Sequence, residues 1–299
     1  MRIVVCGGTG FIGQALARHL LAEGHEVAVL SRSAQKVRAL FGGRVAAVSW
    51  VAAPGFAEGA GAVVNLTGEN IGSGLWTRDK RRRIFDSRVR AGQAVAEAVA
   101  LAQTRPKVVV QASAVGYYGH TGNRTVAEDS PPGKTFLAEV CRQWEPSSAA
   151  VEALGVRRVV IRSGIVLGPG GGVLGQMLPA FRLGLGATLG DGRQGLSWIS
   201  LDDEVRAIAF LIENEAASGV FNLCAPGPVD NRTFAAALAA AVHRPLLLRA
   251  PALAIRLLLG DMGRELLLDG QFVKPMRLLE TGFRFRYPEL TGALAAALS

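Results

Sequence analysis

The feature that most constrains this chain is a glycine-rich segment near its start, Gly7-Gly8-Thr9-Gly10-Phe11-Ile12-Gly13. It directly follows a short apolar run and begins an amphipathic helical pattern. A strand, a glycine turn and a helix in that order form the first unit of a dinucleotide-binding sheet. The spacing is GxxGxxG, and Gly7 allows the tight turn, Gly10 the approach of a pyrophosphate and Gly13 close packing of helix on strand. The alternative is a glycine-rich turn without a ligand. The predicted cofactor contacts in this segment are Gly7, Thr9, Gly10, Phe11, Ile12 and Gly13.

Short apolar runs alternate with helical patterns through the first half of the chain, which predicts crossover units and a parallel sheet. The runs lack polar alternation, as expected for strands covered on both faces. Beyond residue 163 the sequence becomes rich in glycine, which predicts loops over 164–175 and 184–195. We therefore predict an α/β fold, a doubly wound Rossmann sheet in residues 1–163 with a smaller α/β substrate lobe in 164–299, the chain being free to cross back. Predicted strands are 2–6, 26–30, 45–50, 62–66, 107–112, 156–161 and 219–223, and predicted helices are 11–21, 33–41, 78–102, 139–154, 203–214 and 233–242.

Composition excludes several classes of protein. The chain has 299 residues, 49% hydrophobic and 19% charged, which excludes an intrinsically disordered protein. Three separated cysteines and four histidines form no metal-binding or disulfide motif, so no metal site is predicted. No secretory signal is recognised, and the most apolar later stretch, 245–259, is interrupted by Arg249 and Arg256, so we expect no membrane span and a reducing cytoplasmic location.

The net charge of +9 indicates an anionic partner but does not identify it. The strongest basic run, Arg78-Asp79-Lys80-Arg81-Arg82-Arg83, lacks interleaved aromatic residues and accompanies no nucleic-acid motif. A solvated first turn of the long helix explains it better, and no nucleic-acid partner is predicted.

The end of the second predicted strand favours one dinucleotide over the other. An NAD site usually places an acidic residue about 20 positions beyond the glycines to hold the ribose hydroxyl. This chain has Ser31-Arg32 there, and no carboxylate stands nearby to repel a phosphate. An arginine fork and a hydroxyl suit the 2′-phosphate of NADP, so the predicted cofactor is NADP(H). The alternative is that Arg32 only solvates the strand end.

Further motifs resemble those of the short-chain dehydrogenase/reductase superfamily, in its extended, atypical branch, and within it an NAD(P)-dependent epimerase-like family that includes cell-division-inhibitor-like proteins. The resemblance covers nearly the whole chain and implies an NADP-binding Rossmann core with a small C-terminal substrate lobe. It also implies cofactor contacts at Leu66, Thr67 and Gly68, at Arg88, and at Ser163. Because superfamily members are often dimers, the resemblance also implies that this chain can form a homodimer. The motifs are 65–71, Trp76, Ser87-Arg88, 114–119, 128–131, 162–168, Lys274-Pro275, 282–285 and Tyr287-Pro288.

The same resemblance exposes a gap in the catalytic machinery. Superfamily enzymes pair a tyrosine acid/base with a lysine four residues later, because a free tyrosine, with a pKa of about 10, is a poor base. Aligning Glu145 with the usual downstream glutamate places Leu137 and Cys141 at those two positions. Both catalytic groups are missing from this helix.

Other residues could supply the proton. Tyr117-Tyr118 occupy a segment that faces the substrate in extended members of the superfamily, and Ser113 lies five residues before Tyr118. We therefore predict Tyr118, Tyr117 and Ser113 as the candidate catalytic residues. The alternative is that both tyrosines are structural, with one end reaching solvent.

Two functions remain open from the sequence. The first is an epimerase-like, NADP(H)-binding oxidoreductase that acts on an unidentified small hydroxyl or carbonyl compound. The second is an NADP(H)-binding sensor or regulatory protein without catalysis, which the absent tyrosine–lysine pair favours.

Overall fold

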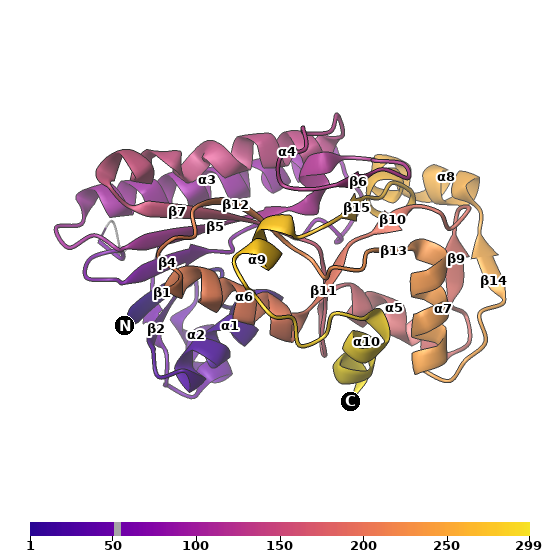
Figure 1. Ribbon diagram of the computed structural model, residues 1–299, viewed down its shortest axis with the longest axis horizontal. Coiled ribbons are helices and arrows are strands. Elements are labelled where there is room, and N and C mark those ends of the chain that lie inside the picture. Colours follow the sequence, from indigo (N-terminus) through magenta and orange to yellow (C-terminus); the bar gives the residue numbers. More distant parts are fainter. Residues whose placement is uncertain (51–54) are drawn as a thin grey trace.

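The computed structural model describes residues 1–50 and 55–299, and its central element is a seven-stranded sheet in which every pair of neighbours is parallel (Figure 1). Strand order is β3-β2-β1-β4-β5-β7-β12, so the chain starts in the middle, winds to one edge, and then returns to build the other half. This is the doubly wound arrangement predicted from the sequence. The strands are β1 (Arg2–Cys6), β2 (Glu26–Leu30), β3 (Ala46–Val48), β4 (Ala62–Asn65), β5 (Val108–Ala114), β7 (Arg157–Ser163) and β12 (Gly219–Leu223).

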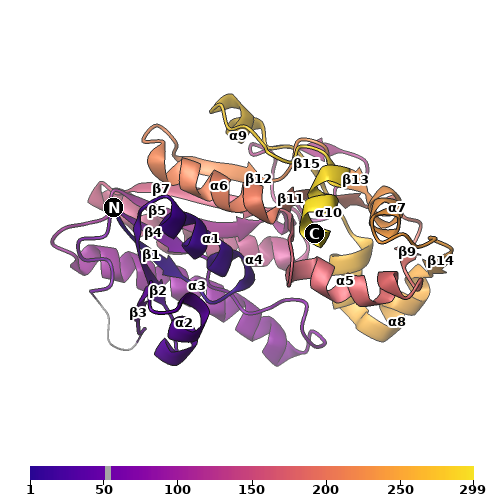
Figure 2. The same cartoon turned by 90° about the horizontal axis from the view of Figure 1, so that it is seen from below.

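Helices cover both faces of the sheet because its strands are apolar on both sides. In β1, Ile3 and Val5 enter one hydrophobic core, whereas Val4 and Cys6 enter the other. Figure 1 shows the two helical layers above and below the sheet, and Figure 2 views the molecule from the side of the lower layer. The first face carries α1 (Phe11–Ala22), α2 (Ala34–Phe41) and α6 (Leu201–Glu213). The second carries α3 (Arg78–Leu101) and a 3₁₀ helix (Glu145–Leu154), with α4 (Phe136–Trp144) packed beside α3.

Some predicted elements differ from the observed ones. The single helix predicted over 139–154 is α-helical only to Trp144 and then tightens into the 3₁₀ helix. Pro146 lies at that transition, where it lacks the N–H that an α-helix interior requires. The loop predicted over 164–175 contains a short strand, β8 (Ile165–Leu167), and the start of α5 (Gly172–Arg182).

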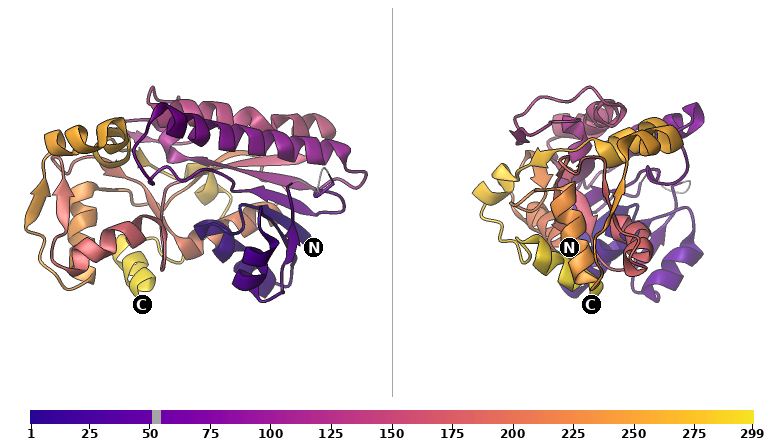
Figure 3. Two further views of the ribbon diagram at one scale, coloured as in Figure 1. Left: turned by 180° about the vertical axis from the view of Figure 1, so that it is seen from behind. Right: turned by 90° about the vertical axis from the view of Figure 1, so that its right-hand side faces the viewer.

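The smaller lobe lies at the carboxyl ends of the central strands, as the views from behind and from the side show (Figure 3). Its own core packs Phe181 of α5 and Phe234 of α7 (Asn231–Ala241) against Trp198 and the C-terminal helix α10 (Leu290–Leu298). Among the described residues, no helix is long and apolar enough to span a membrane. The remaining elements are β6 (Thr125–Val126), β9 (Ala187–Leu189), β10 (Gly195–Leu196), β11 (Trp198–Ser200), β13 (Val229–Asp230), β14 (Leu248–Ala250), β15 (Phe272–Val273), α8 (Ala252–Gly263), a π-helical turn (Arg264–Leu268) and α9 (Met276–Glu280).

The chain crosses back from the smaller lobe into the sheet, a path that the sequence analysis allowed but did not predict. After β11 it forms α6, which packs on the first face, and then β12, which pairs in register with β7 at the edge. The N-cap of α6 is Ser200, whose Oγ accepts the N–H of Asp203 at 3.0 Å. The Asp203 carboxylate accepts the backbone N–H groups of Arg286 and Tyr287 at 2.7 and 2.9 Å, which ties the C-terminal segment to this junction.

Candidate functional site

The glycine-rich turn between β1 and α1 has the geometry that its sequence predicted. Gly7 adopts φ +80°, a left-handed conformation that glycine tolerates best. A Cβ on Gly13 would lie 2.4 Å from the Gly7 carbonyl oxygen, so only glycine lets α1 pack this closely on the turn. The N-terminus of α1 is capped by Gly10 without a side-chain partner, which leaves its first N–H groups available for an anion.

A cleft with a volume of about 600 Å³, here called the cofactor cleft, opens in front of this turn. It brings together the ends of β1, β2 and β4, which are far apart in sequence. The hydroxyl of Thr67 is buried beside it without a hydrogen-bond partner among the described residues, as expected for a group that a ligand satisfies. Eight predicted contacts line the cleft: Gly7, Thr9, Gly10, Ser31, Arg32, Leu66, Thr67 and Gly68.

Three residues of the glycine-rich segment do not line the cleft and instead pack against neighbouring parts of the protein. The Phe11 ring packs against the backbone of Gly171 and Gly172, which joins the first turn of α1 to the smaller lobe. Ile12 packs against the hydrophobic core and Gly13 against the turn. Their predicted contacts with a cofactor stay predictions.

The β2 end of the cleft is basic. Arg32 lines it together with Lys36, which the sequence reasoning did not select although it lies only four residues further on. Ser33 caps α2 by accepting the N–H of Lys36 at 3.2 Å, so a second helix N-terminus begins beside the cleft. Two cations and a helix dipole at one place favour a phosphate.

Glu69 is the one carboxylate among the described residues that line the cleft. Lys80 donates to it at 2.8 Å, and this hydrogen bond lowers the pKa of the Glu69 carboxyl. Lys80 itself is buried, so part of the basic run at the start of α3 serves an internal ion pair rather than solvent. The Glu69 charge is thereby largely compensated before any ligand binds.

Arg88 lies where the cofactor cleft meets a second cavity. Its guanidinium lies against Gly68, which lines the cleft, and Arg88 itself lines the second cavity. Nη1 donates to the carbonyls of Glu69 and Ile84 at 3.1 and 2.9 Å, and the guanidinium stacks 4.9 Å from the Trp144 ring. Burial lowers the pKa of this cation. A guanidinium held by carbonyls at the junction is suited to a phosphate.

The second cavity, here called the inner cavity, has a volume of about 250 Å³ and extends from Ser163 into the smaller lobe. Leu137 and Cys141, at the positions of the absent tyrosine and lysine, both line it. The described lining contains neither a tyrosine nor a lysine. Burial raises the pKa of the Cys141 thiol to about 11, so this cysteine stays protonated and unreactive at neutral pH.

The three residues predicted to be catalytic lie outside the lining of the inner cavity. The Tyr118 hydroxyl donates to Asn222 Oδ1 at 2.7 Å and accepts from Arg162 at 2.9 Å, and burial raises its pKa to about 12. The Tyr117 ring stacks on the Arg162 guanidinium at 3.4 Å. Ser113 donates to Glu145, the ion-pair partner of Arg162, at 2.7 Å. All three therefore make structural contacts around one arginine, and their catalytic role stays a prediction.

Sequence reasoning missed a buried acid behind the inner cavity. Glu204, in the first turn of α6, is fully buried, and Ser163 Oγ donates to its Oε1 at 2.6 Å. Burial raises the pKa of the Glu204 carboxyl from 4.5 to about 8, so it is mostly protonated at pH 7. Its other oxygen has no hydrogen-bond partner in the described chain. Ser163 therefore presents a hydroxyl to the cavity with a protonated acid directly behind it.

No group of histidine, cysteine, aspartate and glutamate side chains among the described residues could hold a metal ion. The glycine turn, the unpartnered Thr67 hydroxyl and the cations at both ends of the cleft instead fit a phosphate-bearing dinucleotide. Fold and site together define a Rossmann protein with its binding site at the carboxyl ends of the parallel strands.

Comparison with known proteins identifies the family. Residues 3–224 match the NAD dependent epimerase/dehydratase family, and residues 250–297 match a domain of unknown function. An epimerase family protein of Mycobacterium leprae is 38% identical over 301 residues, covering 99% of this chain and 95% of its own. The crystal structure of a human epimerase family protein with NADPH superposes with a TM-score of 0.90 at 34% identity, covering 99% of both chains. This chain belongs to the NAD dependent epimerase/dehydratase family.

The comparisons confirm the predicted α/β Rossmann fold and the resemblance to the extended branch of the superfamily. A UDP-glucose 4-epimerase of Thermus thermophilus, solved with NAD, shares the fold at 23% identity, with a TM-score of 0.80 over 99% of this chain and 98% of its own. The predicted cofactor, NADP(H), agrees with the NADPH bound by the human relative.

Proposed function

We propose that this protein is an NADP(H)-dependent oxidoreductase or epimerase that acts on a small hydroxyl or carbonyl compound. The observation that carries the proposal is a second cavity beside the cofactor cleft. Gly68 lines the cleft, the Arg88 guanidinium lies against Gly68, and Arg88 and Ser163 both line the inner cavity, which extends into the smaller lobe. A protein that only senses a dinucleotide needs the first of these spaces and has no use for the second.

The residues of this chain would divide the work along the site. Arg32 and Lys36 hold the 2′-phosphate, while the N-terminus of α1 and Arg88 hold the pyrophosphate. The chemistry that a dinucleotide held in this way would supply is the gain or loss of a hydride by the substrate. When a carbonyl is reduced, Ser163 would give its hydroxyl proton to the substrate oxygen and take the proton of Glu204 in exchange, which leaves Glu204 as a carboxylate. Oxidation of a hydroxyl would move both protons in the opposite direction, and the pair would stand in place of the absent tyrosine.

The competing function is a cofactor-binding sensor without catalysis. Leu137 and Cys141 favour it because neither can act as an acid or base where the superfamily has tyrosine and lysine. The two functions differ in one respect that can be measured, the exchange of hydride with a carbonyl compound.

The first experiment is a fluorescence titration of the wild type, Arg32→Ala and Arg88→Met with NADPH and with NADH. Loss of a charged hydrogen bond costs about 1.5–3 kcal/mol, or roughly 10- to 150-fold in affinity. We expect Arg32→Ala to weaken NADPH by such a factor with little effect on NADH, whereas Arg88→Met weakens both alike. Absence of binding by either dinucleotide in the wild type would refute the proposal.

The second experiment follows NADPH oxidation with a panel of aldehydes and ketones in the wild type, Ser163→Ala and Tyr118→Phe. Proton transfer through Ser163 predicts that turnover falls on the order of 100-fold in Ser163→Ala and little in Tyr118→Phe, with NADPH affinity kept in both. The reverse order would restore Tyr118 as the catalytic residue. Tight NADPH binding without turnover of any member of the panel would favour the sensor.

A further inference from the structure

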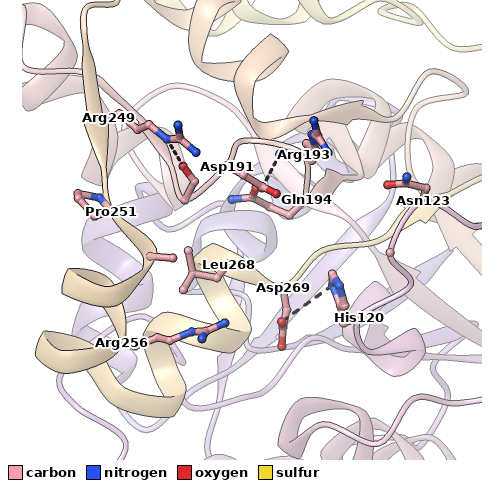
Figure 4. A pocket seen from close by; sticks show the side chains of 13 residues that line it. His120, Asn123, Asp191, Arg193, Gln194, Arg249, Pro251, Arg256, Leu268 and Asp269 are labelled. Carbon is pink, nitrogen blue, oxygen red and sulfur yellow. Dashed lines mark hydrogen bonds and ion pairs between the residues drawn. The ribbon is translucent and has the colours of Figure 1, made fainter.

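A cavity larger than the cofactor cleft lies apart from it and shares none of its described lining residues. Its volume is about 880 Å³, and we call it the arginine pocket because Arg193, Arg249 and Arg256 line it. Figure 4 shows Arg249 and Arg256 pointing in from one side, toward Gln194 and Asp269 on the facing side. The three arginines come from the loop after β9, from β14 and from α8, so the fold alone brings their charges together.

Two of these cations have no hydrogen-bonded partner for their guanidinium groups among the described residues. The side chains of Arg193 and Arg256 make no hydrogen bond or ion pair within residues 1–50 and 55–299. Arg249 is fixed, because its Nε donates to the Gly190 carbonyl at 2.5 Å. Like charges gathered at one cavity repel one another, and an anion between them relieves this repulsion.

The arginine pocket also contains two acidic residues, Asp191 and Asp269. Asp191 accepts the backbone N–H of Arg193 at 3.0 Å within its own loop, and Asp269 lies 3.9 Å from His120 Nδ1. Neither makes a close ion pair with Arg249 or Arg256 among the described residues, although the charge of Arg256 acts on Asp269 at longer range. Burial raises the pKa of the Asp269 carboxyl, and the Arg256 charge lowers it. The pocket contains three arginines and two carboxylates. The pocket therefore keeps an excess of guanidinium groups that suits a phosphate or carboxylate.

The arginine pocket adjoins the inner cavity. Gln194 and Asp269 line both, and Leu267 and Leu268, one residue apart, line the inner cavity and the arginine pocket respectively. An elongated ligand with one end among the arginines and the other at Ser163 would have to pass beside Gln194 and Asp269, the two residues that both spaces share.

The wall of the inner cavity is poorly suited to a polyhydroxylated ligand, since three of its polar side chains are used within the protein. Gln194 Nε2 donates to the carbonyls of Leu189 and Leu267 at 3.2 and 2.7 Å. Ser197 Oγ donates to the Gln271 carbonyl at 2.9 Å. Both carboxylate oxygens of Glu265 accept backbone N–H groups at 2.9 Å.

What remains exposed to a ligand in the inner cavity is largely apolar. Val173 and Met177 come from α5, Leu196 from β10, and Leu266 from the turn after α8. Sugar hydroxyls placed against these side chains would lose their hydrogen bonds to water without replacement. An alkyl segment would gain from the same contacts.

We infer that the substrate is a carbonyl or hydroxyl compound with a short apolar body and an anionic end, a phosphate or a carboxylate, which the arginine pocket binds. This substrate class rests on the proposed function, because it assumes that the reacting carbon lies at Ser163. The arginine pocket thereby selects among the alcohols and ketones that could enter the inner cavity.

The test is a calorimetric titration of NADPH-saturated protein with four probes: hexyl phosphate, hexanoate, hexanol and glycerol 3-phosphate. We expect hexyl phosphate or hexanoate to bind at least about tenfold more tightly than hexanol, which lacks the anion. The tighter of the two anions identifies the head group. Glycerol 3-phosphate, with the same anion on a polar body, is expected to bind more weakly than hexyl phosphate.

Variants connect this binding to the pocket. Because the side chains of Arg193 and Arg256 make no hydrogen bond in the part of the chain that the structure describes, Arg193→Ala and Arg256→Ala should fold normally and each weaken the tighter anion about tenfold. The matched control is Arg142→Ala, an exposed arginine on α4 paired with Glu139, which should change nothing. Unchanged affinity in both pocket variants would overturn the anionic end, and equal or tighter binding of glycerol 3-phosphate would overturn the apolar body. NADPH binding without any probe binding would refute this inference alone, whereas failure to bind NADPH would refute the proposed function.

Discussion

Replacing the buried acid Glu204 by glutamine should make the protein more stable, and more so as the pH rises. Glu204 is fully buried and its carboxyl pKa is raised from 4.5 to about 8. The folded chain therefore holds this proton more tightly than the unfolded chain does. Stability contributed by the protonated group is complete below about pH 4.5 and is lost as the pH rises toward 8, where the folded state also ionises.

The size of the effect follows from the shift. One pKa unit corresponds to about 1.4 kcal/mol, so the ionisable side chain costs the folded state roughly 3 kcal/mol at pH 7 and roughly 5 kcal/mol above pH 8, relative to acid. Glutamine has almost the same shape and still accepts the hydrogen bond from Ser163 through its amide oxygen. Burial of the uncharged glutamine amide also changes the unfolding free energy, by an amount that does not depend on pH.

The assay is urea unfolding of the wild type and Glu204→Gln at several pH values between 5 and 9. We expect the difference in unfolding free energy to grow by about 1.4 kcal/mol per pH unit below pH 8 and then to level off. Glu139→Gln, at an exposed position on α4, is the matched control and should show no such slope. A difference for Glu204→Gln that stays constant across this range would refute the raised pKa and, with it, the protonated acid behind Ser163.

Two further predictions concern the turn and the core. Gly13→Ala should abolish NADPH binding and lower the melting temperature, because the added Cβ would lie 2.4 Å from the Gly7 carbonyl oxygen. The control is Gly175→Ala on α5, whose added Cβ meets nothing within 4 Å and which should be neutral or stabilising in thermal unfolding. Arg162→Met should destabilise the protein by about 3–5 kcal/mol in urea unfolding, because it leaves the largely buried Glu145 carboxylate without its ion-pair partner at 2.8 Å. A loss below about 1 kcal/mol would show that the pair is solvated.

The sequence predicted those parts of the fold and site that local pattern determines. β1 and β2 match their predicted ranges because each is a short apolar run that ends before a glycine or a serine, and β12 also matches its predicted range. The cofactor cleft was predictable because most of its predicted contacts follow directly after β1, β2 and β4. Parallel strands bring these ends to one edge whatever the rest of the chain does.

The arginine pocket and the buried acid were beyond such reasoning. Arg193 and Arg256 are far apart in sequence and lie on elements with no detectable relation before folding. Glu204 follows Asp202 and Asp203 at a helix start, a pattern that predicts a solvated acidic first turn. The packing of α6 on the sheet buries it instead, and packing is decided by tertiary contacts rather than by local sequence.

The return of the chain from the smaller lobe to β12 decides how this protein can be divided experimentally. A fragment ending at residue 163 would lack α6 and β12, so β7 would become an open edge and the apolar face beneath α6 would be exposed to water. Open edges of this kind pair with other chains and aggregate. The residues that bind the dinucleotide therefore cannot be expressed without those that enclose the substrate. Deleting either part would lower the solubility of the protein before any effect on cofactor binding could be measured.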